Sequence, residues 1–458
     1  MKRIVLLTLL TLGIGGCGEK QESNEILIWT HSSPEHPEGK AFEERVLEYN
    51  KKNPDKIQVK IQNFTRTGAG SGYIDKLNAA ITAGETPDIF TLDGPDLASY
   101  VDAGIVKELT PIVDKEFLSG ITTSIIEQGS INDKLYSIGY QDSGVIITYN
   151  KEIFELLPDE VKELVPKSPS DTWTWDDFYL IATELKKLKT NPQTKNLEII
   201  KNMEIPVSFG IEDVTKGAYE IAMYYLAPII WSNDATIISK DGLQVKGYLD
   251  SEKSIEALMK LGRFFADDLG NIVEPEKAFH TGKAAMAIAG NWYISDFQKN
   301  YPNLNYGTFV YPKMSEEYTK NYTPSGSWAF VMNSQLEDGS EKTIQTAKVL
   351  EWLTNDDSVE LYYKKNGAVP VRKEKLNIID TNTPDLSYNE AWDVLKYEVE
   401  YLNKARPASP AYPYISETFA KDIILKIGRE KLTSEKDIRE CVNFAVEKME
   451  KELSKYRK

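Results

Sequence analysis

The stretch Ile26-Leu-Ile-Trp-Thr30 is a short run of apolar and β-branched residues, which is typical of a buried strand. Residues 39–53 follow with apolar side chains at helical spacing, and Pro54 ends this segment. Residues 57–61 then alternate between apolar and polar side chains, which predicts a second strand. The folded part of the chain therefore starts as strand, helix and strand.

The same alternation continues downstream. A helix is predicted over residues 73–83, ended by Gly84, and a strand over Pro87-Asp-Ile-Phe-Thr91. A further helix over residues 96–103 ends at Gly104. Because strands and helices alternate, we expect an α/β fold with parallel strands joined by right-handed crossovers.

A second region of the same character begins at residues 136–149. Its two apolar halves are joined by the polar residues 141–144. We expect the chain to cross there from one lobe to another.

The residues before the first strand predict an export signal. Lys2 and Arg3 precede an apolar run over residues 4–14, which is well short of the roughly 20 residues that span a bilayer. The sequence Ile14-Gly-Gly-Cys17 is similar to a bacterial lipobox, in which the cysteine is acylated and becomes the mature N-terminus. We therefore expect a signal peptide over residues 1–16 and a lipidated tether over 17–25. The alternative is an ordinary cleaved signal in which Cys17 has no role.

The composition describes a soluble globular chain with the length of two to three domains. It has 458 residues, of which 41% are hydrophobic and 27% charged, and no second apolar run reaches membrane-spanning length. The formal charge is -16, and it becomes more negative when Lys2 and Arg3 leave with the signal. Such a surface repels phosphate backbones, so nucleic acid is excluded as a partner. Cys441 is the only cysteine besides Cys17, so no intrachain disulfide is needed.

Several segments resemble, in order, the extracellular solute-binding proteins of ABC importers, in the group typified by maltodextrin-binding protein. The resemblance runs from about Ile26 to the end of the chain. Its most specific piece is Phe279-His-Thr-Gly-Lys-Ala-Ala-Met-Ala-Ile-Ala-Gly-Asn-Trp292. The other pieces are residues 73–104, 144–154 and 169–185, Gly367-Ala-Val-Pro-Val-Arg372 and Ala405-Arg-Pro-Ala-Ser-Pro-Ala-Tyr412.

The resemblance implies two Rossmann-like α/β lobes joined by hinge strands, with a ligand cleft between them, as in type II periplasmic binding proteins. We expect residues 26–140 and 286–338 in the N-terminal lobe, and residues 141–285 and 339–458 in the C-terminal lobe. The family's crossings would then fall near Tyr140, near residues 285–288 and within 336–347.

Polar residues that follow the predicted strands are candidates for ligand binding, since loops at the carboxyl ends of parallel strands face a crevice. Small hydroxyl groups and a carboxylate can hydrogen-bond sugar hydroxyls. These candidates are His31, Ser32, Ser33, Thr65, Arg66, Asp93 and Gly94. The alternatives are an ordinary polar turn after the first strand and a helix-capping role for Asp93. The glycine-rich residues 68–72 lack the lysine of a P-loop and predict a flexible loop.

Aromatic residues point to a sugar ligand. The chain has 8 Trp and 25 Tyr, whose flat apolar faces can stack on the C–H face of a pyranose ring. Trp292, which follows Gly290 and Asn291, is similar in position to a sugar-stacking tryptophan of the family. The resemblance also implies ligand contacts for Gln141, Tyr224, Trp231, Asn233, Asn291, Gly326, Ser327, Arg372 and Tyr412.

Two departures from the family pattern limit what can be carried over. The family commonly has Trp-x-Asn-Gly-Gly where this chain has Trp231-Ser-Asn-Asp-Ala235, which puts the path of that loop in doubt. Gln141 stands where the maltodextrin type has an acidic residue, so the same sugar is not implied.

The sequence therefore predicts a substrate-binding lipoprotein of an ABC importer, a monomer without cofactor or metal that captures a sugar by lobe closure. Its lipid would hold it on the outer side of the cytoplasmic membrane, where it delivers the sugar to a permease. An exported glycoside hydrolase is an alternative, but no placed carboxylate pair, GxSxG, HExxH or CxxC motif supports it. A receptor for peptide or metal is another; the chain has only His31, His36 and His280, which makes metal the poorer choice.

Overall fold

The computed structural model describes residues 25–66, 72–171, 173–318, 321–326, 328–381 and 384–457. The predicted leader, Cys17 and Ser327 lie outside these residues. Among the described helices, none combines the length and the apolar character that a membrane crossing requires.

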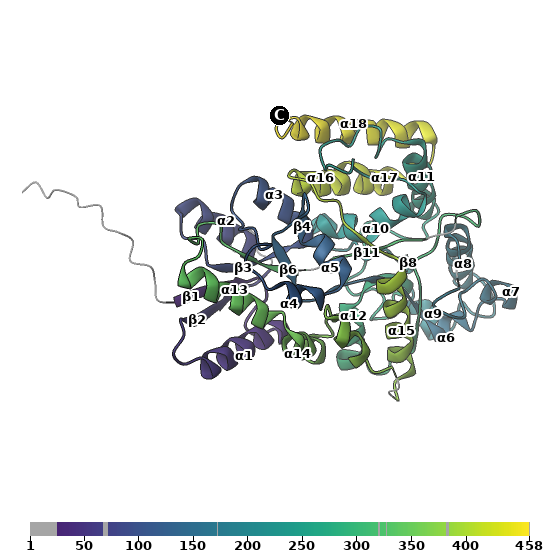
Figure 1. The fold of residues 1–458 in the computed structure, drawn as a ribbon. Helices are drawn as coiled ribbons and strands as arrows, with labels where there is room; N and C mark the ends of the chain where they lie inside the picture. Colours follow the sequence, from purple (N-terminus) through teal and green to yellow (C-terminus); the bar gives the residue numbers. More distant parts are fainter. Residues whose placement is uncertain are drawn as a thin grey trace, which may run out of the picture.

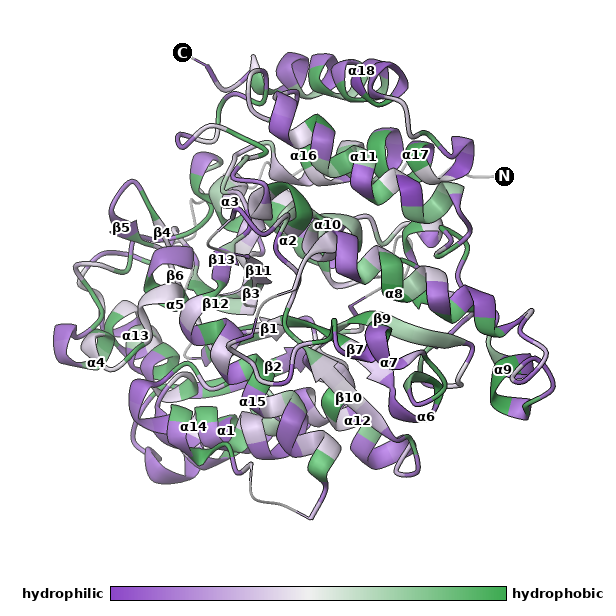
Figure 2. Cartoon of the chain, turned by 90° about the vertical axis from the view of Figure 1, so that its right-hand side faces the viewer, coloured by the Kyte–Doolittle hydropathy of each residue, from purple (hydrophilic) through white to green (hydrophobic). Residues whose placement is uncertain are grey.

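Two separate hydrophobic cores divide the described chain into two lobes, which lie side by side in Figure 1. The predicted fold class, two α/β lobes, is confirmed. Many helices carry hydrophobic residues on one side and hydrophilic residues on the other, as Figure 2 shows for α18 (Glu435–Leu453).

The first lobe is built on a five-stranded sheet with the order β2-β1-β3-β12-β6. Strands β1, β2 and β3 are parallel, and β12 runs antiparallel to both of its neighbours. Their bounds are β1 Glu25–Thr30, β2 Gln58–Asn63, β3 Ile89–Asp93, β12 Trp328–Met332 and β6 Ser137–Gly139.

The helices of the first lobe cover this sheet, and α1 packs against α13 and α14. Pro37 opens α1 at a position where no amide hydrogen is needed, and Gly84 ends α2 in the left-handed conformation. The helices are α1 Pro37–Lys52, α2 Tyr73–Ala83, η1 Gly94–Asp96, α3 Leu97–Asp102, α4 Lys115–Ser119, α5 Thr123–Gln128, α13 Glu341–Leu353, α14 Asp356–Asn366 and η3 Lys373–Ile378. A short hairpin joins β4 (Ser130–Ile131) to β5 (Lys134–Leu135).

The second lobe has a four-stranded sheet with the order β10-β7-β9-β8, in which β8 and β9 are parallel. Its strands are β7 Val145–Asn150, β8 Ile205–Ser208, β9 Ala284–Gly290 and β10 Tyr306–Phe309. Its helices are α6 Lys151–Phe154, α7 Asp159–Lys162, α8 Trp175–Leu188, α9 Glu198–Asn202, η2 Val214–Lys216, α10 Glu220–Ser232, α11 Glu252–Ala266, α12 Trp292–Asn300, α15 Leu386–Tyr401, α16 Tyr412–Thr418, η4 Phe419–Ile424, α17 Leu425–Glu430 and α18. A separate parallel pair joins β11 (Thr323–Ser325) to β13 (Asn403–Ala405).

The predicted lobe boundaries are wrong in two places. Residues 286–325 were expected in the N-terminal lobe, but β9, α12 and β10 belong to the second sheet and its core. Residues 339–371 were expected in the C-terminal lobe, but α13 and α14 pack into the first core. The physical reason is that β9 is a continuous buried strand between β7 and β8, so the chain cannot cross within it.

The three crossings follow from the strands and cores. The first lies between β6 and β7, near Tyr140 as predicted. The second lies between Ser325 and Trp328, rather than at residues 285–288. The third lies between Val371 of the first core and Ile379 of the second, rather than within 336–347.

Candidate functional site

The carboxyl ends of β1 and β3 face the second lobe. The two strands are parallel neighbours, with Ile28 opposite Ile89 and Trp29 opposite Phe90, so the loops that follow them start at the same edge of the sheet. His31 follows β1 directly, and Asp93 is the last residue of β3. The candidate site is where they meet the segment after β13 and the start of α10.

A buried ion cluster joins the two lobes at this point. Nη2 of Arg406 lies 2.6 Å from Oδ1 of Asp93, and Nη1 lies 3.3 Å from Oδ2 of the same carboxylate. Nη1 also lies 2.6 Å from Oε1 of Glu220 in the second lobe. The hydroxyls of Tyr412 and Ser416 donate to Glu220. Asp93 and Tyr412 were both predicted to bind the ligand. They are linked through Arg406 and Glu220, which were not predicted.

Burial shapes the titration of this cluster. It raises the pKa of Glu220, an effect that Arg406 opposes and that the Asp93 carboxylate reinforces. Burial also raises the pKa of Asp96 to about 8, and the nearby carboxylates of Asp93 and Glu220 add to this shift. The cluster therefore has three carboxyl groups around Arg406, of which Asp96 favours its neutral form.

On the first-lobe side, His31 stacks on Trp328, with ring centroids 3.5 Å apart and an interplanar angle of 16°. The Arg66 guanidinium lies 4.8 Å from the centroid of the Trp328 ring and 3.9 Å from Oδ2 of Asp93. Burial lowers the pKa of His31 well below its usual value. The His31 imidazole is therefore neutral at neutral pH.

On the second-lobe side, the exposed ring is that of Trp292 at the start of α12. It stacks near Tyr224 and Tyr225, with centroids 6.0 and 6.3 Å away and interplanar angles of 24° and 16°. The Trp292 residue is 40% exposed, whereas both tyrosines are buried. A Cβ atom on Gly290 would lie 2.3 Å from the ring, so only glycine lets Trp292 rest against the end of β9.

The rings of Trp292, Tyr224 and Tyr225 form what we call the aromatic wall. Tyr224 also contacts Arg406 of the ion cluster and Ser143, which lies where the chain first crosses between the lobes. The Arg406 guanidinium lies 4.8 Å from the Tyr224 ring centroid, and the tyrosine hydroxyl is 2.6 Å from Oγ of Ser143. Ser143 donates to the carbonyl oxygen of Gly326. A Cβ on Gly326 would come within 2.5 Å of Arg406, so this predicted residue gives the guanidinium its space.

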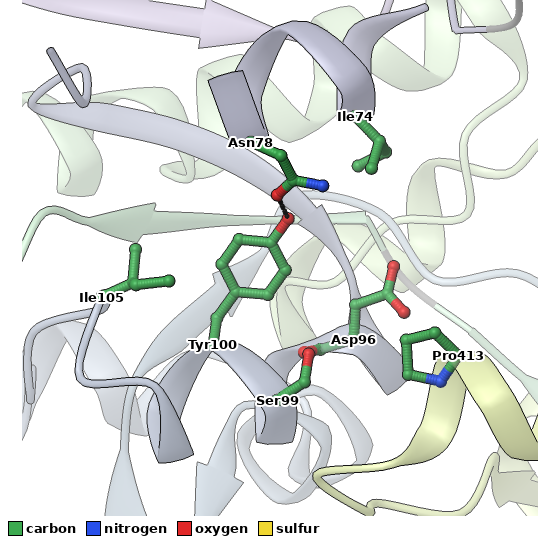
Figure 3. Close-up of a pocket in the computed structure, with 7 residues that line it drawn as sticks. All are labelled: Ile74, Asn78, Asp96, Ser99, Tyr100, Ile105 and Pro413. Atoms are coloured by element: carbon green, nitrogen blue, oxygen red, sulfur yellow. Dashed lines mark hydrogen bonds between the residues drawn. The ribbon is translucent and has the colours of Figure 1, made fainter. Parts of the chain in front are cut away.

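A cavity of about 340 Å³ opens beside the cluster, where α2 and α3 of the first lobe approach α16 of the second (Figure 3). Asp96 and Pro413 lie next to each other at one end of the view, and Tyr100 donates a hydrogen bond to Asn78 over 3.0 Å. The cavity is lined by Ile74, Asn78, Asp96, Ser99, Tyr100, Ile105 and Pro413. Both lobes therefore contribute to its wall.

Three predicted residues have structural partners instead of facing this cluster. The Nε of Arg372 donates to Asp356 over 2.7 Å and its Nη1 donates to the Phe117 carbonyl, all within the first lobe. Trp231 is buried in the second core. Asn233 is fully buried, and its amide donates to Lys253 and Glu256 of α11.

The loop after Asn233 explains how the chain tolerates the loss of the family's glycines. Asp234 has a φ of 54°, in the left-handed region that glycine adopts most readily. Aspartate is one of the few other residues that visit this region, so Asp234 can adopt this conformation without a glycine.

The remaining predicted residues differ in burial and have no hydrogen bond to the cluster among those that the structure shows for the described residues. Asn291 is buried, its backbone amide donates to Gly144, and its side-chain amide donates to Gly367 at 3.4 Å. Ser32 is buried, whereas Ser33 and Gln141 are half-buried and Thr65 is exposed. Gly94 begins the η1 turn directly after Asp93. Among the residues that the structure describes, no group of three His, Cys, Asp or Glu could hold a metal ion.

Sequence reasoning missed Arg406, Glu220 and Trp328. Arg406 stands within the 405–412 segment that carries the resemblance, which was the available signal. Nothing in the sequence links it to Asp93, because 313 positions separate them. Trp328 follows directly after the predicted Ser327, but no pattern indicated that its ring would pair with His31.

Comparison with known proteins agrees with this architecture. The curated galactooligosaccharide-binding protein of Bacillus subtilis is 23% identical over 383 residues, covering 81% of this chain and 80% of that protein. Three binding proteins of Brucella species, also 23% identical, are matched over 66% of their own length, just under two thirds.

Solved structures show the same fold. The ABC substrate-binding protein of Listeria monocytogenes in complex with cycloalternan has a TM-score of 0.70 at 20% identity, covering 94% of this chain and 99% of that one. The cyclic alpha-maltosyl-1,6-maltose binding protein of Arthrobacter globiformis has a TM-score of 0.71 at 18% identity, with 93% and 99% covered. The family described as bacterial extracellular solute-binding protein matches residues 44–386. This chain is therefore a member of the bacterial extracellular solute-binding protein family.

Proposed function

We propose that the protein is the sugar receptor of an ABC importer, which captures an oligosaccharide between its lobes and delivers it to a membrane permease. The observation that carries this proposal is the exposed Trp292 ring, fixed on Gly290 and backed by Tyr224 and Tyr225. Relatives whose names record binding of galacto- and arabino-oligosaccharides support the ligand class.

The chemistry of the site suits a neutral sugar. The C–H face of a pyranose stacks on an aromatic ring, while its hydroxyl groups need donors and acceptors close by. The Asp93 carboxylate can accept hydroxyl hydrogens, and the Arg66 and Arg406 guanidinium groups can donate. Because these groups come from both lobes, a sugar bound to all of them favours the closed arrangement.

The export and anchoring steps belong to the same proposal. The leader and Cys17 would place the protein outside the cytoplasmic membrane as a monomeric lipoprotein, with Gly18 to Glu25 as the tether. Several acyl chains are needed for lasting attachment, since a single chain binds a bilayer only marginally.

A thermal-shift screen tests the ligand class. The purified protein is heated with short malto-, galacto- and arabino-oligosaccharides and with the matching monosaccharides and peptides. A sugar that binds only the native state raises Tm in a concentration-dependent way, and titration calorimetry then gives its affinity. A shift with peptides alone, or with none of these compounds, would argue against a sugar receptor.

Product analysis of the same mixtures separates a receptor from a hydrolase. A glycosidase needs two carboxyl groups placed on either side of the scissile bond, one of them as a proton donor. We expect the oligosaccharides to be recovered intact after prolonged incubation. Their conversion to shorter sugars would favour the enzyme.

A further inference from the structure

The Asp93 carboxylate belongs to the first lobe and is hydrogen-bonded to Arg406 of the second lobe. Resting on the proposed function, we propose that Arg406 is a positioning residue that couples the ligand-reading carboxylate of Asp93 to closure of the lobes. The geometry that points to this role is a planar pair of contacts across the lobe boundary.

Arg406 is anchored on the second lobe from two sides. Glu220 holds Nη1 at 2.6 Å, and Tyr412 and Ser416 fix Glu220 in turn. The Tyr224 ring lies 4.8 Å from the guanidinium carbon. The side chain of Arg406 is only 5% exposed, so it has little freedom to follow Asp93 if the lobes separate.

The contact with Asp93 uses both carboxylate oxygens. The two N–H donors of one guanidinium edge reach Oδ1 at 2.6 Å and Oδ2 at 3.3 Å, the fork arrangement that fixes a carboxylate in orientation as well as in place. A carboxylate has about four acceptor positions, so two remain for ligand hydroxyls. Asp93 can therefore still accept hydrogen bonds from sugar hydroxyls, while Arg406 of the second lobe fixes the orientation of its carboxylate plane.

When the contact between Asp93 and Arg406 breaks, neither residue is left without an oppositely charged partner. When the lobes part, Arg406 keeps Glu220 as a partner on its own lobe. Asp93 keeps Arg66, whose Nη2 lies 3.9 Å away within the first lobe and whose side chain is exposed. Asp96 adds a third carboxyl group nearby, and Tyr412 and Tyr224 complete the polar groups that face Arg406. Because each residue of the pair has a second partner on its own lobe, the contact can form and break reversibly. We call this contact between Asp93 and Arg406 the latch.

The test measures the distance between the lobes without any sugar. Spin labels are placed on the full chain carrying Cys17→Ser at two exposed sites, Leu47→Cys in the first lobe and Phe444→Cys in the second. Burial raises the pKa of the Cys441 thiol to about 11, so it stays unlabelled at neutral pH. Pulsed electron spin resonance then gives the distribution of interlobe distances.

The variants separate the latch from a merely structural role. Asp93→Asn leaves Arg406 paired with Glu220, and Arg406→Gln removes the fork; each should shift the sugar-free distribution toward longer distances. Arg406→Lys keeps the charge without the fork and should restore the wild-type distribution only in part. The matched control is Arg439→Gln, which removes a guanidinium from an ion pair on the surface of α18 and should change nothing.

Affinity provides the second readout, with the oligosaccharide of the screen that raises Tm most as the probe. Each single variant should weaken binding by at least about tenfold, and the loss in the double variant should be smaller than the sum of the two single losses, because both changes remove the same contact between the lobes. Distances unchanged in Asp93→Asn and Arg406→Gln, or losses that add fully in the double variant, would overturn the inference. Since the distances need no ligand, a protein that binds no sugar would refute the proposed function and leave the latch to be judged separately.

Discussion

At the scale of single residues, Trp292 shows how one side chain can be held ready for a ligand. Its ring rests on the end of β9 at Gly290 and stacks near Tyr224 and Tyr225, yet the residue is 40% exposed. A large apolar side chain held rigidly at the surface loses little conformational freedom when it binds, so most of its contact energy is available for the ligand.

Replacement of Trp292 by alanine should weaken sugar binding and leave the fold intact. An aromatic contact contributes about 0.5–1.5 kcal/mol beyond the area that it buries, so we expect a loss of about tenfold in affinity. Titration calorimetry measures it. Tyr401→Ala, which removes another exposed aromatic ring from the same lobe, serves as the control and should bind as tightly as the wild type.

Glu398 is a buried acid that the proposed site does not use. It is fully buried in α15, its Oε1 accepts from the Tyr311 amide at 3.1 Å, and its Oε2 has no hydrogen-bond partner among the described residues. Burial raises the pKa of Glu398 well above its usual value. The folded state therefore holds a proton here that the unfolded chain releases at lower pH.

The sign of the pH dependence follows from this difference. Because the folded pKa of Glu398 is the higher one, its contribution to stability is complete at low pH and is lost as the pH rises through that pKa. Tm should fall as the pH rises above about 4.3, the pKa of an unperturbed glutamate, and Glu398→Gln should reduce this fall. Some slope will remain, since burial also raises the pKa values of Glu38 and Asp142. Glu400→Gln, an exposed neighbour, should not change the slope; an equal slope in Glu398→Gln would contradict the prediction.

The site could be predicted from the sequence only where a residue follows a recognisable strand or motif. His31 and Asp93 could be named as candidates because they follow predicted strands, and Trp292 because it ends the most specific segment of the resemblance. Arg406 and Glu220 were missed because their roles arise from contacts between distant parts of the chain. Arg372 and Asn233 were assigned to the ligand from neighbouring sequence, although their polar groups are used inside their own lobes.

At the scale of elements, β9 places the aromatic wall. All seven of its residues are buried, and it pairs with β7 on one edge and with β8 on the other. The strand ends at Gly290, and α12 begins two residues later with Trp292 itself. The strand's last residue thus determines where the first ring of the helix can lie.

A methyl group at the end of β9 should displace that ring. Gly290→Ala would put a Cβ 2.3 Å from the Trp292 side chain, so we expect the ring to move and sugar affinity to fall. Calorimetry on Gly290→Ala, Trp292→Ala and the double variant tests this. Because both single changes act through one ring, the double variant should bind about as weakly as Trp292→Ala alone. Fully additive losses would show that Gly290 acts in another way.

The same strand explains why the lobe boundaries could not be read from the sequence. A run of small apolar residues predicts a buried strand, but it carries no information on which sheet the strand joins. The family resemblance implied a crossing near residues 285–288, whereas β9 pairs with β7 and β8 along its length. Helices α13 and α14 pose the same problem, since their apolar faces would suit either core.

At the scale of the whole molecule, the acidic composition sets the response to salt. The formal charge of -16 produces self-repulsion that opposes the compact state. Many ion pairs lie on the surface, but each contributes only about 0–1 kcal/mol. We therefore expect the net repulsion to dominate the response.

Tm should rise as salt is added. Raising NaCl from about 0.01 M to about 0.1 M shortens the screening length from about 30 Å to about 10 Å, which weakens repulsion across the surface. Differential scanning calorimetry measures the change. Choline chloride at the same concentration should give the same rise, which excludes binding of sodium ions; a fall in Tm with both salts would show that the ion pairs dominate.

The interleaving of the two lobes along the chain also fixes the order in which their two sheets can be completed during synthesis. All four strands of the second sheet have left the ribosome once Phe309 has emerged, whereas β12, which joins β3 to β6 in the first sheet, ends only at Met332. Domains generally fold as units while translation proceeds. The first lobe is therefore the one whose synthesis begins first and whose sheet is completed last. The edges of its early strands remain unpaired until β12 has been synthesised.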